Sequence, residues 1–268
     1  MKKILLLGLI IFPGSFHLIA QKETLEKKIC VDIIGNRIET DNFGNVYVVD
    51  NSSLKKFDSD GSLICSYTEL SDGKISGIDA SDPLKIIIFN SDFGKIKFLD
   101  NKLTVKNNSI SLQDLGYSNS TLVSASYESG FWIFDPLSNQ IVRFDKALQV
   151  SHSSGNINDL IGHDFEPNFM TEYDNTLYLN DPRYGIFIFD RYATYMKTIP
   201  IKNLKVFQVF NNKIVYLDNN FLISLNLKTF EESKLKLPFS DEEIINATID
   251  NQRVYFITKT KFCIYKFS

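Results

Sequence analysis

The phrase LKKFD at residues 54–58 returns in related form five more times along the chain. Most copies are apolar stretches that close on a large side chain followed by an acid or an amide. The other copies are IKFLD (96–100), IVRFD (141–145), FIFD (187–190), LISLN (222–226) and CIYKF (263–267). Because a phrase that repeats at a regular interval marks a repeat architecture, this pattern outweighs any single motif in predicting the fold.

A second anchor gives the length of the repeat. Each copy follows an apolar strand, and these strands are centred on Tyr47, Ile87, Trp132, Tyr178, Tyr216 and Tyr255, with successive spacings of 40, 45, 46, 38 and 39 residues. One four-stranded propeller blade takes about 40–45 residues. Within the first unit, Gly44 and Asn45 separate two apolar stretches, as in a hairpin turn. The sequence therefore predicts an all-β fold, a six-bladed β-propeller.

The last of the six repeats runs out of sequence after its third strand. The apolar segment 28–35 precedes the first repeat and is the natural fourth strand of the last blade. Pairing the two ends of the chain in one sheet removes an exposed edge. The predicted blades lie near 36–67, 75–106, 119–150, 168–200, 203–235, and 244–268 together with 28–35.

Residues 1–20 form a separate unit. Lys2 and Lys3 precede a short apolar run, and Ala20 offers a small residue at a cleavage point, which is the pattern of a secretory signal peptide. A single propeller domain then spans 21–268. No second hydrophobic segment predicts a membrane span, and we expect an exported protein, periplasmic in the first place and extracellular in the second. The formal net charge is −3 and no basic stripe is present, which argues against nucleic-acid binding.

The three cysteines are Cys30, Cys65 and Cys263, and an odd number rules out a complete disulfide framework. Cys65 is expected to pack as a small apolar residue in a blade strand. If 28–35 closes the ring, Cys30 and Cys263 share a sheet. The pair is then either a disulfide that locks the ring or two buried thiols.

The residues that usually carry catalysis are sparse. His17 lies in the leader, which leaves His152 and His163, and no serine-hydrolase, zinc-protease or phosphate-loop motif occurs. We therefore expect no catalytic residues, no cofactor and no metal site. The recurring Asp58, Asp100, Asp145 and Asp190 keep the symmetry of the repeat, which favours a structural role in turns. The alternative is a hydrolase or lactonase with a divalent metal in the central channel, for which Asp79 is a candidate lining residue.

The turns between second and third strands all fall on one face of a propeller. Two of them carry an aromatic residue before a glycine, namely Phe93 and Tyr184, and Arg183 precedes Tyr184. Arg and Tyr are enriched where proteins bind each other tightly. The stretch 153–169 is the longest segment without strand character; it includes His163 and Phe165, and Asn156 or Asn158 is expected to cap a helical turn there. The partner-binding candidates are Phe93, Arg183, Tyr184, His163 and Phe165.

The first repeat resembles the blades of six-bladed NHL and TolB-like propellers, on DNFGNVYVVD (41–50) and LKKFDSDGSLI (54–64). Longer phrases, such as DPLKIIIFNSDFGKIKFLDNKLT (82–104) and LYLNDPRYGIFIFDRYATYMKTIPIK (177–202), are similar to exported propeller-like proteins of the Bacteroidota. That resemblance implies a non-catalytic periplasmic protein that binds a partner at the outer membrane, such as the plug of the type 9 secretion translocon. A glycan- or peptide-binding sensor is the other non-enzymatic reading.

Overall fold

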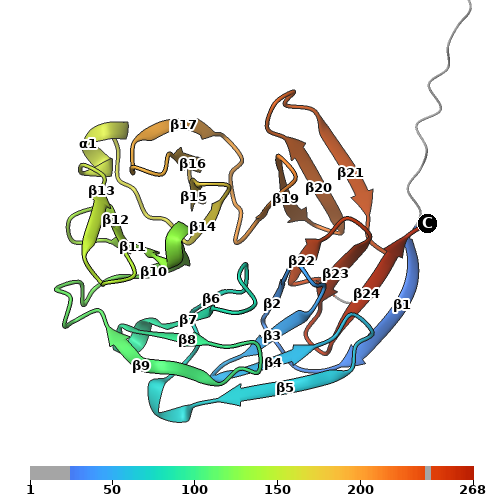
Figure 1. The fold of residues 1–268 in the computed structure, drawn as a ribbon. Helices are drawn as coiled ribbons and strands as arrows, with labels where there is room; N and C mark the ends of the chain where they lie inside the picture. The colour runs from blue at the N-terminus through green and yellow to red at the C-terminus, as the bar shows by residue number, and fades with distance from the viewer. Residues whose placement is uncertain (1–24, 239–242) are drawn as a thin grey trace, which may run out of the picture.

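The computed structural model describes residues 25–238 and 243–268, so the predicted signal peptide at 1–20 lies outside the described residues. Six four-stranded antiparallel sheets stand in a ring around a central opening (Figure 1). The predicted six-bladed β-propeller is confirmed. Among the described residues, no helix has the length and apolar character needed to cross a bilayer.

Each blade begins with its strand nearest the central opening and proceeds outwards. The strands of blades one to three are β2 (Arg37–Thr40), β3 (Val46–Asp50), β4 (Ser53–Phe57), β5 (Leu63–Thr68); β6 (Gly77–Asp79), β7 (Ile86–Asn90), β8 (Lys95–Leu99), β9 (Val105–Ser111); and β10 (Leu122–Ala125), β11 (Phe131–Asp135), β12 (Gln140–Phe144), β13 (Val150–Ser153). Those of blades four and five are β14 (Phe169–Tyr173), β15 (Thr176–Asp181), β16 (Gly185–Phe189), β17 (Tyr195–Ile199); and β18 (Gln208–Phe210), β19 (Lys213–Asp218), β20 (Phe221–Asn226), β21 (Glu232–Lys236).

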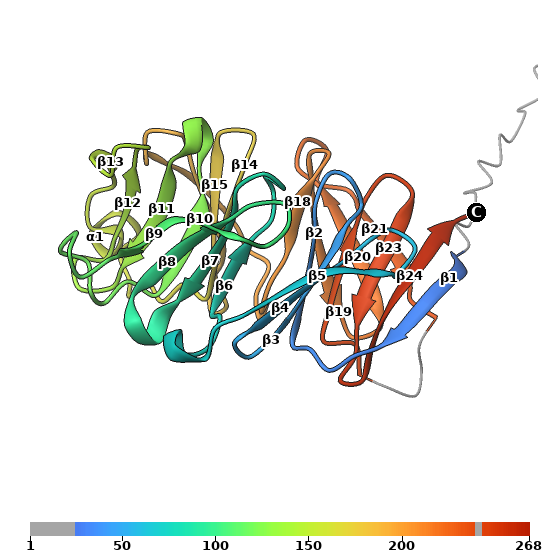
Figure 2. The same cartoon turned by 60° about the horizontal axis from the view of Figure 1, so that its bottom comes forward.

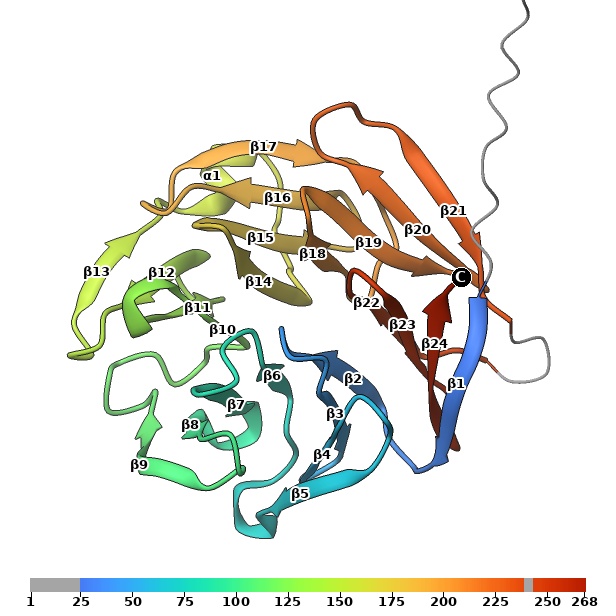
Figure 3. The ribbon, with the colours of Figure 1, turned by 45° about the vertical axis from the view of Figure 1, so that its right-hand side comes forward.

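Blade six is built from both ends of the chain. It contains β22 (Asn246–Ile249), β23 (Arg253–Ile257) and β24 (Lys261–Phe267), and β1 (Leu25–Asp32) adds the outer strand. Figures 1 and 3 show β1, in blue, alongside β24, in red. In this pairing Cys30 lies directly opposite Cys263, and a disulfide joins them. The alternative of two buried thiols was therefore wrong. Cys65 is a free thiol on β5 that packs against the core between blades one and two.

The hydrophobic core lies between neighbouring blades. All five residues of β7, β11 and β16 are buried, because each of these strands is covered on both faces. Between blades two and three, Phe131 stacks on Phe144 with ring centroids 5.1 Å apart, and Phe89 packs in the same cluster. Continuous burial of this kind explains why the second-strand anchors of the repeat are bulky side chains.

The recurring aspartates close the turns between third and fourth strands. The carboxylates of Asp58, Asp100, Asp145 and Asp190 each accept hydrogen bonds from the backbone N–H groups two and four residues further on. The third residue after each aspartate has a positive φ: Gly61, Leu103, Leu148 and Ala193. The predicted structural role of these aspartates is thus observed in four blades.

Asp145→Ala is expected to lower the free energy of unfolding by about 1–2 kcal/mol, because two backbone N–H groups lose a charged acceptor. Urea denaturation measures the loss. Asp114→Ala is the matched control, since Asp114 is exposed, and it should change stability by no more than about 0.5 kcal/mol. Equal effects of the two substitutions would contradict a structural role for the recurring aspartate.

The disc has two faces. We call one the connection face: it carries the turns between second and third strands and the links from one blade to the next. The other, the channel face, carries the turns between first and second strands. In Figure 2 the β1–β2, β3–β4 and β5–β6 connections lie along the lower edge, which belongs to the connection face.

Candidate functional site

Arg183 and Tyr184 lie on the connection face, in the β15–β16 turn of blade four. The Arg183 guanidinium donates to both carboxylate oxygens of Asp181, at 3.1 and 2.8 Å, and Asp181 is fully buried. It also donates to the carbonyl oxygen of Asp164 at 3.0 Å and forms an ion pair with Glu166 at 3.2 Å. Arg183 therefore joins the β15–β16 turn to the 153–169 segment through these hydrogen bonds and ion pairs. Its side chain is 40% exposed.

His163 completes this cluster. Its ring stacks on Tyr184 with centroids 3.6 Å apart, and its Nδ1 lies 3.1 Å from the carbonyl oxygen of Asp164. His163 follows the short helix α1 (Ile157–Ile161), whose C-terminal cap is Gly162 with φ 76°. The Asn156 side chain caps the N-terminus of α1, and Asn156 is one of the two predicted caps. His163 and Tyr184 are both half-buried, so part of this stacked pair of rings remains exposed.

Phe165 does not belong to the surface. It is 2% exposed, and it packs edge-to-face against Phe134 of blade three and Phe187 of blade four. The sequence-based assignment of Phe165 as a partner contact does not fit this position. A large aromatic ring loses most contact with water when it fills the space between two blades. The residues around Phe165 in the sequence are mostly polar, so they did not indicate that its ring is buried.

Phe93 is 55% exposed on the same face, but in blade two, two blades away from the Arg183 cluster. It ends a short 3-10 turn, Ser91–Phe93, and the Lys95 ammonium lies 5.8 Å from its ring. The connection face carries further exposed apolar side chains that the sequence analysis did not single out. They are Ile34 (70%), Leu70 (78%), Leu137 (75%), Leu160 (51%) and Phe221 (40%).

Hollows lie on the same face, where neighbouring blades meet. One, of about 410 Å³, lies between blades one and two near Asn51 and Ser91. Another, of about 430 Å³, lies between blades three and four near Asn139 and Pro167. A third, of about 410 Å³, lies between blades five and six near Asn219. The connection face thus carries both exposed apolar side chains and recesses.

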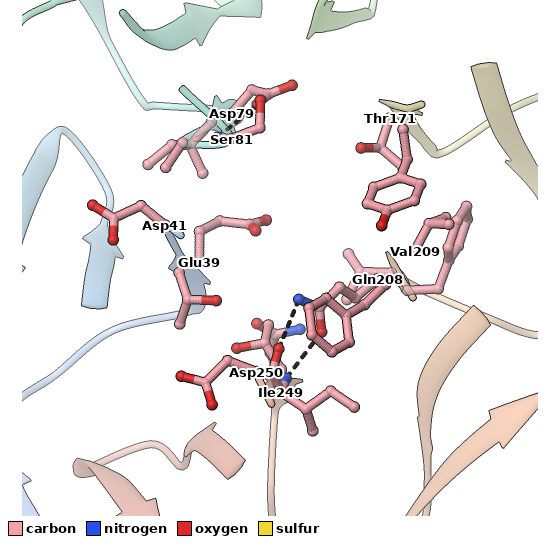
Figure 4. A pocket seen from close by; sticks show the side chains of 18 of the residues that line it. Glu39, Asp41, Asp79, Ser81, Thr171, Gln208, Val209, Ile249 and Asp250 are labelled. Atoms are coloured by element: carbon pink, nitrogen blue, oxygen red, sulfur yellow. Dashed lines mark hydrogen bonds between the residues drawn. The ribbon is translucent and has the colours of Figure 1, made fainter. Parts of the chain in front are cut away.

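The channel face carries a different feature, a pocket of about 350 Å³ in the central opening. First strands of five blades line it, and Figure 4 shows Glu39, Asp79, Thr171 and Gln208 around the opening. Asp79 is the residue that the sequence analysis proposed for the channel. Its carboxylate accepts from Ser81 and, across the blade boundary, from the Ala125 N–H at 2.8 Å and the Ser124 hydroxyl at 3.1 Å.

Other lining side chains also tie neighbouring blades together. Glu172 of blade four accepts from the Tyr127 N–H, the Ser126 hydroxyl and the Trp132 indole N–H of blade three. Gln208 of blade five exchanges two hydrogen bonds with the backbone of Ile249 in blade six (Figure 4). These bonds replace the edge-to-edge pairing that the first strands cannot make with one another.

Arg37 and Glu39 form an ion pair on the channel wall, with Nη2 2.8 Å from Oε1. Burial raises the pKa of Glu39, the Arg37 guanidinium opposes that shift, and the nearby Asp79 adds to it. The Arg37 guanidinium also lies 5.4 Å from the centre of the Phe169 ring. The wall therefore combines acidic, cationic and aromatic groups.

Sequence reasoning missed most of these channel residues, although a signal was present. The strand pairings place Glu39 opposite Tyr47, Ser124 opposite Trp132, and Thr248 opposite Tyr255. Asp79 opposite Ile87 and Thr171 opposite Tyr178 follow the same rule. A polar residue seven or eight positions before an anchor of the repeat therefore marks the channel wall.

No group of three or more His, Cys, Asp or Glu side chains that could hold a metal ion occurs within 25–238 and 243–268. The Asp79 and Glu172 carboxylates accept hydrogen bonds from neutral donors, and Glu39 accepts from Arg37. These described residues offer no donor set for the metal-dependent hydrolase that the sequence analysis kept as an alternative.

No protein-family model matches this chain, and no curated protein matches its sequence. Solved structures do resemble its fold. A streptogramin B lyase aligns with a TM-score of 0.62 and 13% identity, over 92% of this chain and 98% of that one. The Pan2 WD40 domain of Neurospora crassa aligns at 0.60 and 8% identity, over 91% and 96%. A chain of the mitotic checkpoint complex aligns at 0.67 and 11% identity, over 99% of both.

Identities this low establish a shared fold only. The similar structures include an enzyme and a component of a protein complex, so the propeller scaffold by itself does not decide between catalysis and binding. The chain is a six-bladed β-propeller, and its function has to be argued from its own faces.

Proposed function

We propose that this protein is an exported, non-catalytic propeller that binds a protein partner through its connection face. The observation that carries the proposal is the gathering of exposed apolar side chains on that face, with examples from blade one to blade five. Exposed apolar side chains gain free energy when a partner covers them, and recesses on the same face suit the side chains of a partner protein.

The Arg183–Tyr184–His163 cluster supports this location. The Arg183 guanidinium is held in place by Asp181 and Glu166, so this side chain loses little conformational freedom when a partner covers it. Rigid aromatic and arginine side chains are the usual anchors of protein interfaces. The opposite face carries exposed apolar side chains too, including Phe43 and Leu84, and the variants described below decide between the two faces.

The particular partner is proposed from the sequence resemblance. A periplasmic propeller of this type would bind a large outer-membrane protein, and the plug of the type 9 secretion translocon is the specific role that we put forward. A disc with an apolar face would close the periplasmic end of such a channel by covering it. Neither a catalytic residue nor a cofactor enters this proposal.

The test is mild crosslinking in the native cell, followed by affinity isolation of the tagged protein and mass spectrometry. We expect one very large outer-membrane protein to be recovered with the wild-type chain. Leu70→Lys combined with Leu137→Lys should lower that recovery at least about tenfold, because two desolvated apolar contacts become charges. Both side chains are at least 75% exposed, so the melting temperature should not change.

Phe43→Lys combined with Leu84→Lys is the matched control. These residues are 72% and 60% exposed in the first-to-second strand turns, which places them on the channel face. The control pair should recover the partner as the wild type does. Equal loss with both pairs, or undiminished recovery with the connection-face pair, would exclude this face as the binding surface.

A further inference from the structure

The central pocket has a strongly one-sided charge. Five carboxylates line it, Glu39, Asp41, Asp79, Glu172 and Asp250, against the single guanidinium of Arg37. Neutral groups donate to four of them. Asp41 accepts from the Phe43 and Asn45 N–H groups and the Tyr47 hydroxyl, Asp250 accepts from the Gln252 and Arg253 N–H groups and the Tyr255 hydroxyl, and Asp79 and Glu172 accept as described above. Those hydrogen bonds hold the carboxylates in place without cancelling their charge.

A narrow opening with low-dielectric walls concentrates such a field. Arg37 neutralises Glu39, and Arg253 lies 4.0 Å from Asp250 at the pocket edge. Asp41, Asp79 and Glu172 have no cationic partner among the ion pairs within the described part of the chain. A positively charged ligand is therefore favoured in this pocket over a neutral or anionic one.

The walls add an apolar and aromatic surface. Phe169 and Phe207 pack edge-to-face at 5.0 Å, and Tyr173 and Phe210 line the same pocket. The Arg37 guanidinium lies over the Phe169 ring, so one of these rings already contacts a cation. A ligand with both a charge and an apolar stem would use both properties.

We propose that the central pocket binds an organic cation, a primary ammonium or guanidinium group on a short apolar stem. A volume of about 350 Å³ suits a ligand of the size of one basic side chain. Such a group belongs either to a free amine or to a lysine or arginine of a peptide. Because the pocket opens on the channel face, this site is separate from the protein-binding surface proposed above, and neither depends on the other.

Isothermal titration with butylammonium, and with the neutral isostere 1-butanol, tests the charge requirement. We expect butylammonium to bind at least about tenfold more tightly, with an affinity that falls as salt is added. Nα-acetyl-lysine N-methylamide distinguishes the two sources: tighter binding than butylammonium identifies a peptide side chain, and weaker binding a free amine. Butanol binding as tightly as butylammonium, or no binding of any cation, overturns the proposal.

Two variants locate the site. Glu39→Gln leaves Arg37 unpaired in the pocket and should weaken butylammonium binding about tenfold, whereas Arg37→Gln should strengthen it. Glu26→Gln, on the outer strand β1, is the matched control and should change nothing. Unchanged affinity in both Glu39→Gln and Arg37→Gln would contradict a site in the channel.

Discussion

Replacement of Cys30 and Cys263 by alanine is expected to lower the free energy of unfolding by about 4–5 kcal/mol, the largest effect of any change considered for this protein. The disulfide joins residues 233 positions apart, so it encloses nearly the whole propeller in one covalent loop. In the chain-entropy description, a loop of that length removes more freedom from the unfolded chain than a short one. It also holds β1 on β24, the pairing that closes the ring.

Urea denaturation with and without dithiothreitol measures this contribution. The wild-type midpoint should fall on reduction to that of the double alanine variant, and the reductant should have no effect on the variant. Cys65→Ala is the control, because Cys65 is a free thiol on β5 and its loss leaves the Cys30–Cys263 disulfide intact. A wild-type midpoint that does not respond to reduction would show that the bond adds nothing to stability.

Arg183→Ala is expected to destabilise the fold by about 2–3 kcal/mol, and thus not to be a clean test of partner binding. Removing one member of a buried ion pair costs about 3–5 kcal/mol, and partial exposure of the guanidinium lowers that figure here. The fully buried Asp181 carboxylate would keep only the N–H groups of Glu166 and Arg183. Lys259→Ala, in the equivalent turn of blade six and 77% exposed, should cost no more than about 0.5 kcal/mol.

The pH dependence identifies the cause. Burial alone would raise the pKa of Asp181, but hydrogen bonds from Arg183 and from the Glu166 and Arg183 backbone outweigh it, and the pKa lies below its usual value of 3.8. A lowered folded-state pKa stabilises the protein above the unfolded-state pKa, and this stabilisation is lost as the pH falls through the folded-state pKa. Without Arg183, fewer hydrogen bonds oppose the effect of burial, and the pKa of Asp181 rises.

The variant should therefore lose less relative to wild type at about pH 4 than at about pH 7, because its carboxyl group can take up a proton. Urea midpoints at the two pH values, for wild type, Arg183→Ala and Lys259→Ala, measure the change. A difference between wild type and Arg183→Ala that stays constant with pH would mean that the loss comes from packing and not from the buried charge.

The roles of some candidate residues depend on neighbours in the sequence, and those of others depend on distant parts of the chain. Asp145 and its three counterparts act within five residues, so the repeat alone predicted their role in the turns. Asn156 caps α1 by the same local logic. Phe165 and Arg183 were placed correctly on a turn or a link, but whether each faces solvent depends on side chains of a neighbouring blade or segment.

The sequence by itself determined the number of blades, the strand order within each blade and the closure of the ring by the first strand. These features follow from the spacing of apolar strands and from turn chemistry, both of which are local along the chain. Only the tertiary structure decided the Cys30–Cys263 bond, the burial of Phe165 and the acidic central pocket. The repeat places Glu39 and Thr248, 209 residues apart in sequence, on first strands, but which side chains meet in the pocket depends on how the closed ring packs.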